Sequence, residues 1–374
     1  MTRNFHSEPF SESTLTKLEL FQRYLVEWLP VFLSSRTGFV NTVNIFDFFA
    51  GPGIDGNGVD GSPLIIYKSI FLYSRFIRKN NISVNLYFNE INPEKSAELE
   101  KNISDQNKNR RPFSLSIDCK DFIKVFDEYY PIMQHPNTAN LIFLDQQGFS
   151  QITDDIFLKI TSLNTTDFMF FIASSFVHRF RKEKITKKYF RLSDDGQGTI
   201  DNNYVHREIR DYYETIISEN NRKWFLGQFS IKKGSNIYGI IFGSKNTLGI
   251  DKFVRSCWKI DPLRGNANFD IDRENIDTSM PSLFPEMNKP TKIKEYELEL
   301  EKYVMSGEIT SNHEIYIFSI LNGILPRFAR AKLKQMMYDN IIPKQKINIS
   351  YNAYKEKMIN IRLDYGTKFK HRMD

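Results

Sequence analysis

The chain contains 374 residues, 41% of them hydrophobic and 26% charged, which predicts a globular protein with a full α/β domain and a smaller second domain. Its formal charge of +6 permits a nucleic acid partner without establishing one, and its two cysteines lack the paired spacing of zinc or iron–sulfur ligands. No run of about 18 apolar residues occurs in the sequence, so we expect no membrane span, and the low cysteine content fits a cytoplasmic location.

Up to about residue 175, helical and strand patterns alternate along the chain. A helix is expected over residues 14–34, where apolar residues recur at spacings of three and four and Thr14 can cap the amino end. Five strands follow, with helices between them, which predicts an α/β fold with a doubly wound, Rossmann-like parallel sheet. The expected strands are 42–48, 83–88, 113–117, 139–144 and 167–172, and the expected helices between them are 63–78, 93–104, one that ends near 130, and 154–161.

The chain that follows is less regular. Residues 176–224 are basic and helical in tendency, which fits either a solvated helix face or a phosphate-facing insertion beside the mouth of the active site. Residues 231–246 indicate a closing antiparallel pair of strands, and a helix is expected over 250–258. We therefore place the first domain at 1–265, followed at 266–292 by an irregular linker rich in Pro, Asn and Asp.

Residues 293–374 are expected to form a small winged helix-turn-helix domain. Three short helical patterns are followed by two candidate β segments, at 296–305, 312–321 and 327–338 for the helices and at 346–350 and 358–363 for the strands. From residue 325 to the end there are 12 Lys and Arg against 4 Asp and Glu, a formal charge of +8. This excess is typical of phosphate binding, although small winged helices also serve as protein docking modules. The candidate nucleic-acid contacts are Arg327, Arg330, Lys332 and Lys334.

The most informative motif lies at residues 44–53, where an apolar strand ends in Asp47 and runs into Ala50-Gly51-Pro52-Gly53. Glycine lets a backbone approach a ligand closely because it has no Cβ. Phe-x-Gly-x-Gly in place of Gly-x-Gly-x-x-Gly shifts the prediction from a dinucleotide to S-adenosylmethionine (SAM), which has a ribose but no pyrophosphate. Ala50, Gly51 and Gly53 would then lie against the methionine part of SAM, and Asp47 would orient the loop or meet the amino group. The alternative is an ordinary strand–turn–helix in which glycine only tightens the turn.

Further candidates follow the next strands, whose carboxyl ends would meet at the same edge of the sheet. Glu90 would hold the ribose hydroxyls, and Asp118 would accept a hydrogen bond from the adenine amino group. Asp145 would face the transferred methyl, with Gln146 and Gln147 beside it as candidates for the methyl-transfer step. Amino-methylating enzymes commonly carry an acid or amide, two prolines and an aromatic here. This chain keeps the acid and lacks the prolines, so the sequence supports ligand binding more strongly than catalysis.

The run Phe46-Asp47-Phe48-Phe49-Ala50-Gly51-Pro52-Gly53, followed by Gly61-Ser62-Pro63-Leu64, resembles the three-Cys-motif partner proteins. The leading helix at 17–33, the segments 145–148 and 249–258, and the basic carboxy-terminal region are similar to that family as well, so the resemblance covers nearly the whole chain. It implies a SAM-methyltransferase-like fold and a companion protein with a three-cysteine motif related to radical-SAM enzymes. Such pairs usually belong to mobile-element or phage-related gene neighbourhoods.

Three functions are compatible with these observations. The leading one is a SAM-dependent, methyltransferase-like enzyme that acts on nucleic acid held by the winged helix. The second is a non-catalytic adaptor, whose Rossmann-like domain binds SAM or nothing and whose winged helix recruits a partner protein or a nucleic acid. The third is a nuclease or other hydrolase, which would need clustered carboxylates around a metal; the spacing of the acids predicts no such cluster, so no metal site is expected.

Overall fold

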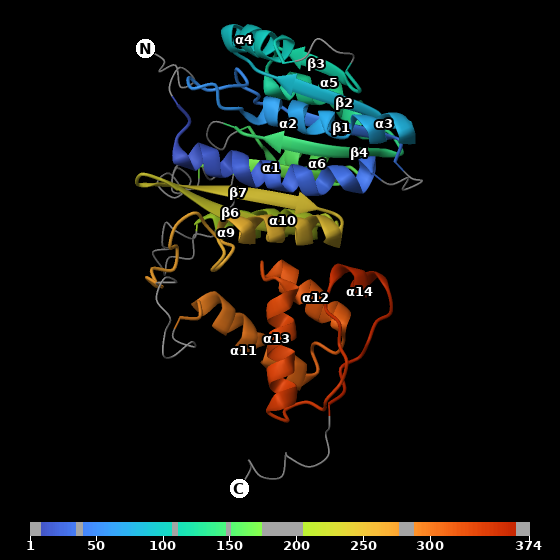
Figure 1. The fold of residues 1–374 in the computed structure, drawn as a ribbon, viewed down its shortest axis with the longest axis vertical. Coiled ribbons are helices and arrows are strands. Elements are labelled where there is room, and N and C mark those ends of the chain that lie inside the picture. Colours follow the sequence, from blue (N-terminus) through green and yellow to red (C-terminus); the bar gives the residue numbers. More distant parts are fainter. Residues whose placement is uncertain are drawn as a thin grey trace. The chain divides into compact units, whose positions relative to one another are not determined.

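The computed structural model describes residues 9–34, 40–106, 111–146, 151–173, 205–276 and 288–363 (Figure 1). The chain divides into two compact units, of which unit 1 comprises Met1–Ser256 and Ala267–Phe269, and unit 2 comprises Cys257–Asn266 and Asp270–Asp374. Most of the basic segment expected at 176–224 lies outside the described residues. In the described part of the chain, no helix is long and apolar enough to span a membrane.

Unit 1 is built on a seven-stranded sheet with the order β3-β2-β1-β4-β5-β7-β6 (Figure 1). The first five strands run parallel, and β7 runs antiparallel to both β5 and β6. The strand order reverses between β1 and β4, and a ligand of such a sheet binds outside the carboxyl ends of the strands at that point. The strands are β1 (Thr42–Asp47), β2 (Ser83–Asn89), β3 (Ser114–Asp118), β4 (Thr138–Leu144), β5 (Thr166–Ile172), β6 (Phe225–Lys233) and β7 (Asn236–Ser244). The predicted strands and the closing antiparallel pair are confirmed.

Helices cover both faces of this sheet, which is why the central parallel strands β1 and β4 are buried on both sides. On one face, aromatic residues of three helices, Phe126, Phe157 and Tyr213, share a buried cluster with Phe46 and Phe170 of the sheet. The helices of unit 1 are α1 (Glu12–Leu33), α2 (Ser62–Phe71), α3 (Ser74–Asn80), α4 (Pro93–Ser104), α5 (Phe122–Met133), α6 (Asp154–Ser162), α9 (Val205–Glu219) and α10 (Thr247–Ile260), the last of which has residues 257–260 assigned to unit 2.

Helix α1 packs on the opposite face. The ring of Phe21 stacks on Phe143 of β4 with 4.3 Å between centroids, and Tyr24 meets Phe242 of β7 edge-on at 4.7 Å. Its amino end differs from the prediction, because Ser11 rather than Thr14 is the N-cap: the Ser11 hydroxyl accepts from the Thr14 amide. The helix therefore starts at Glu12.

The helix expected at 63–78 is two helices, α2 and α3. Two tight hydrogen bonds end α2, from the Leu72 amide to Ser69 O (3.3 Å) and from the Tyr73 amide to Ile70 O (2.9 Å). Such i→i−3 bonds narrow the last turn of a helix and stop its propagation. The prediction of one continuous helix was wrong because the apolar spacing carries on across this break.

A ladder of polar side chains crosses the buried sheet. Asn85 donates to Asn44 (2.8 Å), Asn44 donates to Asn140 (3.2 Å) and Asn140 donates to Thr166 (3.0 Å). Ser114 extends the ladder by donating to Asn85 (2.6 Å), so it joins β3, β2, β1, β4 and β5. Because a slip of one residue would leave these buried amides unpaired, the ladder fixes the register of the parallel strands.

Unit 2 contains four described helices, α11 (Thr291–Ser306), α12 (Asn312–Leu321), α13 (Pro326–Tyr338) and α14 (Tyr351–Lys355). The three predicted helices are confirmed, whereas the two β segments are wrong. Within residues 339–363, the backbone makes only one isolated bridge, between Ser311 and Asn360. Ser350 caps α14 by accepting from the Ala353 amide, so this stretch turns into a helix where a strand was expected.

The first part of the expected linker is irregular in backbone but held by a buried ion cluster. Arg264 is 3% exposed, and its guanidinium lies 2.9 Å from Asp270 and 2.7 Å from Glu274. Asp272 is a third carboxylate, at 3.6 Å. The buried guanidinium of Arg264 thus holds the three carboxylates together, because without it these acids would lie near one another with no counter-charge.

Candidate functional site

The turn after β1 brings the backbone close to itself. Gly51 and Gly53 have φ angles of 63° and 88°, a left-handed region that glycine enters without a steric penalty. The Gly61 amide donates to Gly53 O (2.7 Å), and the Ala50 amide donates to Asn89 O at the end of β2 (2.9 Å). This turn therefore places the backbone that follows β1 beside the end of β2.

The loop over residues 51–62 is rich in glycine, a composition typical of a flexible loop, but in the structure hydrogen bonds hold it in place. Its base is buried, and Asp55 is only 5% exposed. The Asp55 carboxylate accepts from the amides of Asn57 (2.9 Å) and Val59 (2.8 Å) across the tip, and from the amide of Phe10 ahead of α1 (2.7 Å). The glycines here allow close backbone contacts. A glycine-rich composition is the same in a tightly packed loop and in a flexible one, so the sequence alone does not distinguish the two.

Alanine substitutions in this loop test the close packing. A Cβ on Gly53 would lie 2.8 Å from Cδ1 of the fully buried Leu99, in addition to the strain of its positive φ. Gly58 has a similar φ of 76° with no atom within 4 Å of such a Cβ, so it is a matched control. We expect Gly58→Ala to lower the free energy of unfolding by about 1 kcal/mol and Gly53→Ala by about 1–3 kcal/mol more, measured by urea denaturation. Equal losses would contradict a tight contact between the turn and α4.

Glu90 ties the glycine turn to the turn after β2. Its Oε2 accepts from the Gly51 amide (3.0 Å), and its Oε1 accepts from the Asn92 amide (2.9 Å). Asn92 in turn caps α4 by accepting from Glu94 and Lys95. The half-buried carboxylate thus holds two loops in place, and each oxygen keeps a second lone pair for a ligand hydroxyl.

Asp118 lies at the end of β3 with both oxygens engaged. The hydroxyl of Tyr129 donates to Oδ2, and the ammonium of Lys120 lies 3.1 Å from Oδ1. Burial, together with this bond to Asp118, raises the pKa of Tyr129 to about 12. An adenine amino group that met Asp118 would therefore share the carboxylate with these two neighbours.

An apolar surface beside Glu90 was missed by the sequence analysis. Ile91 is 63% exposed directly after Glu90, and the thiol of the exposed Cys119 donates to Ile91 O at 3.6 Å. The two residues follow β2 and β3, so a flat apolar group could pack at this edge. The signal available in the sequence was an isoleucine placed within a polar turn after an acid.

Asp47 is fully buried at the end of β1. One carboxylate oxygen, Oδ1, accepts from the Phe49 amide (3.3 Å), and Oδ2 has no hydrogen-bond partner among the described residues. Burial raises the pKa of Asp47 to about 7; the charge of Asp145 adds to the rise, whereas Ser62, the Phe49 amide and Lys17 oppose it. A buried acceptor without a hydrogen-bond partner is costly, so this atom could accept from a ligand donor in addition to the Ser62 hydroxyl, which acts on the same carboxylate.

Lys17 is the largest omission of the sequence analysis. It is 7% exposed on α1, and its ammonium forms an ion pair with Oδ2 of Asp145 at the end of β4. The same ammonium lies 4.8 Å from the centre of the Phe171 ring on β5. The sequence did contain a signal, because residue 17 falls four positions before Phe21 and so lies on the apolar stripe of the helix.

Gln146 is 2% exposed, and its carbonyl accepts from the Gln151 amide at 3.0 Å. Its amide nitrogen Nε2 has no partner among the described residues. Asp145 and Gln146 therefore lie together at the end of β4, beside the end of β1. Gln147, the third candidate for methyl transfer, lies outside the described residues.

The basic face of unit 2 is narrower than expected. Arg327, Arg330 and Lys334 are exposed on α13 at spacings of three and four, so they form one stripe. Lys332 is separated from this stripe by its pairing with Glu301 of α11 (2.5 Å), with only 13% of its side chain exposed. Tyr338, 81% exposed, continues the stripe and was not predicted.

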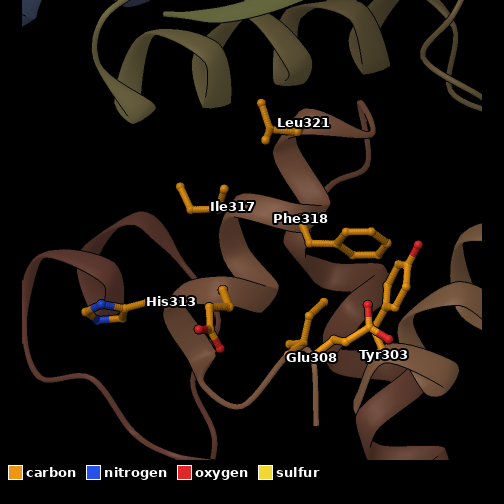
Figure 2. A pocket seen from close by; sticks show the side chains of 8 residues that line it. Tyr303, Glu308, His313, Ile317, Phe318 and Leu321 are labelled. Atoms are coloured by element: carbon orange, nitrogen blue, oxygen red, sulfur yellow. The ribbon is translucent and has the colours of Figure 1, made fainter. Parts of the chain in front are cut away.

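Unit 2 also carries an apolar groove of about 460 Å³ between the end of α11 and α12. Figure 2 shows the rings of Tyr303 and Phe318 side by side, with Ile317 and Leu321 on adjoining turns and His313 pointing away from them. The two rings meet edge-on at 5.5 Å. Glu314 lines the groove but serves the capping box of α12, so the groove offers few polar groups to orient a ligand.

Over the described ranges, no group of three or more His, Cys, Asp or Glu side chains could hold a metal ion. No family model matches the chain, and no curated protein matches it.

Unit 1 nevertheless has a Rossmann-like, SAM-methyltransferase-like fold: the sheet is parallel with a reversed strand β7, and a glycine turn follows β1.

Solved structures with some similarity to the chain include one complex with S-adenosyl-L-methionine, one methyltransferase and one putative methylase. They include Trm1 from Pyrococcus horikoshii in complex with S-adenosyl-L-methionine, with 9% identity, a TM-score of 0.41, and 79% of this chain and 87% of that chain covered. DszA carbon methyltransferase has 11% identity, a TM-score of 0.32 and coverage of 60% and 54%. The putative methylase HI0767 from Haemophilus influenzae has 12% identity, a TM-score of 0.28 and coverage of 60% and 89%.

Proposed function

We propose that this protein is a SAM-dependent methyltransferase-like enzyme that acts on nucleic acid. The observation that carries the proposal is Asp47, a fully buried carboxylate under the glycine turn whose Oδ2 has no hydrogen-bond partner among the described residues. The α-ammonium of SAM could donate a hydrogen bond to this oxygen. Its positive charge would also favour the ionised form of Asp47. When bound, SAM would supply an activated methyl group.

The neighbouring residues fit the rest of the cofactor. Glu90 would accept from the ribose hydroxyls while it keeps its bonds to the two loops. Ile91 would pack against the adenine ring, and Asp118 would accept from the adenine amino group in company with Tyr129 and Lys120. Gly51 and Gly53 would let the turn approach the methionine part without a Cβ in the way.

At the end of β4, Asp145 and Gln146 would orient the group that receives the methyl. Asp145 Oδ1 makes no hydrogen bond with a described residue, so it could accept from an amine, and Gln146 Nε2 could donate to a neighbouring carbonyl or ring nitrogen. Methyl transfer is an in-line displacement, so the main task of these side chains is to position the nucleophile.

Unit 2 would hold the nucleic acid through the stripe Arg327, Arg330 and Lys334 on α13. We expect Arg330→Ala and Lys334→Ala each to weaken nucleic-acid binding and to lower the slope of affinity against salt by about 1, because each removes one phosphate contact. Lys332→Ala is the control: it should leave that slope unchanged, since Lys332 pairs with Glu301. Fluorescence anisotropy with labelled DNA and RNA at several salt concentrations measures this. Affinity that is independent of salt would instead favour protein docking by unit 2.

A second candidate is the non-catalytic adaptor. It is favoured because the residues that follow β4 already bind other parts of the chain: Asp145 pairs with Lys17, and the carbonyl of Gln146 accepts from the Gln151 amide. The companion three-cysteine protein, implied by the sequence resemblance, would then be the recruited partner.

Transfer of labelled methyl from SAM to DNA and RNA separates the two candidates. The enzyme is expected to label one of the polymers, with at least a tenfold loss in Asp145→Ala. SAM binding without any label in either polymer, both alone and with the companion protein, would favour the adaptor.

A further inference from the structure

A cation is held at the carboxyl edge of the sheet by the chain itself. The Lys17 ammonium pairs with Asp145 Oδ2 and lies 4.8 Å from the centre of the Phe171 ring. Phe171 is in turn stacked on Tyr238 of β7, with 5.0 Å between centroids and 11° between planes. A carboxylate and the face of an aromatic ring are the two groups that best stabilise a buried ammonium. Lys17 thus fills a built cation subsite, not merely a gap in the core.

We propose that Lys17 occupies this subsite so that the acceptor site takes an uncharged amine, such as the exocyclic amino group of a nucleobase, and rejects a cationic one. The proposal rests on the proposed methyl transfer and names its substrate class. Lys17 acts here as a positioning and specificity residue, since it holds Asp145 and does not itself react.

The charges around Lys17 support this choice of substrate. The described ionisable groups that face it are Asp145, with which it pairs, and Asp47, whose charge it helps to stabilise. The positive charge of Lys17 cancels the negative charge of Asp145. A second ammonium would therefore find no net negative charge on this pair, and Lys17 would repel it. The side chain of an acceptor lysine is protonated at neutral pH, with an ordinary pKa of about 10.4, and would have to lose its water and its proton to bind there.

An uncharged amine meets no such barrier. It can donate to Asp145 Oδ1, which makes no hydrogen bond with a described residue, while Lys17 keeps Oδ2. In the transfer, the nitrogen lone pair forms the new N–CH₃ bond, the electrons of the broken S–CH₃ bond stay on sulfur as a thioether, and the nitrogen releases one proton to Asp145. The pairing with Lys17 fixes the carboxylate that receives this proton.

The subsite can be tested without any methyl transfer. Lys17→Ala removes three methylenes and the ammonium, which n-propylammonium replaces atom for atom. We expect n-propylammonium to raise the unfolding temperature of Lys17→Ala by about 2–4 °C at saturation, or to restore a folded yield if the variant alone does not fold. The uncharged isostere 1-propanol should have no such effect, and neither compound should affect the wild type. No rescue, or equal rescue in Lys17→Ala/Asp145→Asn, would overturn the cation subsite.

The specificity is tested with labelled SAM and two acceptors, nucleic acid and a lysine-rich peptide. The wild type is expected to methylate the nucleic acid alone, and Lys17→Met, which keeps the apolar stem, is expected to lose at least tenfold of this discrimination. Methylation of the peptide by the wild type, or unchanged discrimination in Lys17→Met, would overturn the proposal. If neither the nucleic acid nor the peptide is methylated, the proposed function is contradicted. The rescue experiment with n-propylammonium would still decide whether the subsite exists.

Discussion

Replacement of Glu90 by alanine is expected to weaken SAM binding by tenfold or more. The carboxylate would lose its charged hydrogen bonds to the ribose hydroxyls, each worth about 1.5–3 kcal/mol. The same change removes the acceptor for the Gly51 and Asn92 amides, so the glycine turn would also lose its tie to the β2 turn. Calorimetric titration of the variant with SAM measures the combined effect.

Glu90→Gln separates the two contributions. Glutamine keeps one acceptor oxygen but replaces the other with an amide group, which cannot accept from a backbone N–H. An intermediate affinity is expected, together with thermal stability closer to that of the wild type than to that of Glu90→Ala. Wild-type affinity in Glu90→Ala would contradict the assignment of the ribose to this residue.

SAM binding is expected to strengthen as the pH rises through about 7. Burial raises the pKa of Asp47 to about 7, so the carboxylate becomes ionised, and able to pair with the cofactor ammonium, only near and above that pH. Affinity should rise by about tenfold per pH unit below 7 and level off above it. Asp47→Asn, which cannot ionise, should bind weakly and show no such rise. Wild-type affinity that does not change between pH 5.5 and 8.5 would contradict the role of Asp47.

The same residue should carry a stability cost. The pKa of Asp47 is about 7 in the folded state against an ordinary value of 3.8, so between about pH 4 and 7 the folded chain keeps a proton that the unfolded chain releases. The contribution of this group to the free energy of unfolding therefore falls as the pH rises across that window, and is constant above it. Asp47→Asn should remove the fall and stabilise the protein at pH 8 by on the order of 2 kcal/mol, measured by chemical denaturation. Loss of stability in Asp47→Asn at pH 8 would contradict this account.

The sheet was predictable because its strands leave two strong signals in the sequence. Each parallel strand is a short apolar run, as at 139–144, and each ends near a polar residue or a glycine turn. Pro93 at the start of α4 and the apolar spacing of α1 were equally direct, since both depend only on local geometry. The order of the strands in the sheet leaves no such local signal in the sequence, because it depends on how the strands pair in space.

The site was predictable in part, for a related reason. Asp47, Glu90, Asp118 and Asp145 could be placed at the sheet edge because each follows a recognisable strand. Their partners could not, because these come from distant segments: Lys17 is 128 positions from Asp145, and Gly51 is 39 positions from Glu90. Whether an oxygen is engaged or without a partner, as Asp47 Oδ2 is, depends on those contacts and decides what the site can bind.

Unit 2 shows where local patterns mislead. Residues 346–350 alternate in a way that is typical of a strand, but Ser350 instead caps α14, and Gln345 exchanges side-chain hydrogen bonds with the backbone of Arg362. Side-chain hydrogen bonds thus hold these two segments together, where backbone hydrogen bonds between two strands were expected. Likewise, charge alone did not distinguish Lys332, which pairs with Glu301, from the exposed Lys334.

Calorimetric titration of the full chain with SAM and, separately, with NAD tests most directly whether the carboxyl edge of β1, β2 and β4 binds SAM. Both ligands carry an adenosine, but only NAD carries a pyrophosphate, for which the turn after β1 lacks the Gly-x-Gly-x-x-Gly pattern. We expect one SAM bound per chain with micromolar affinity and no detectable binding of NAD. Binding of NAD in preference to SAM, or of neither, would contradict this expectation.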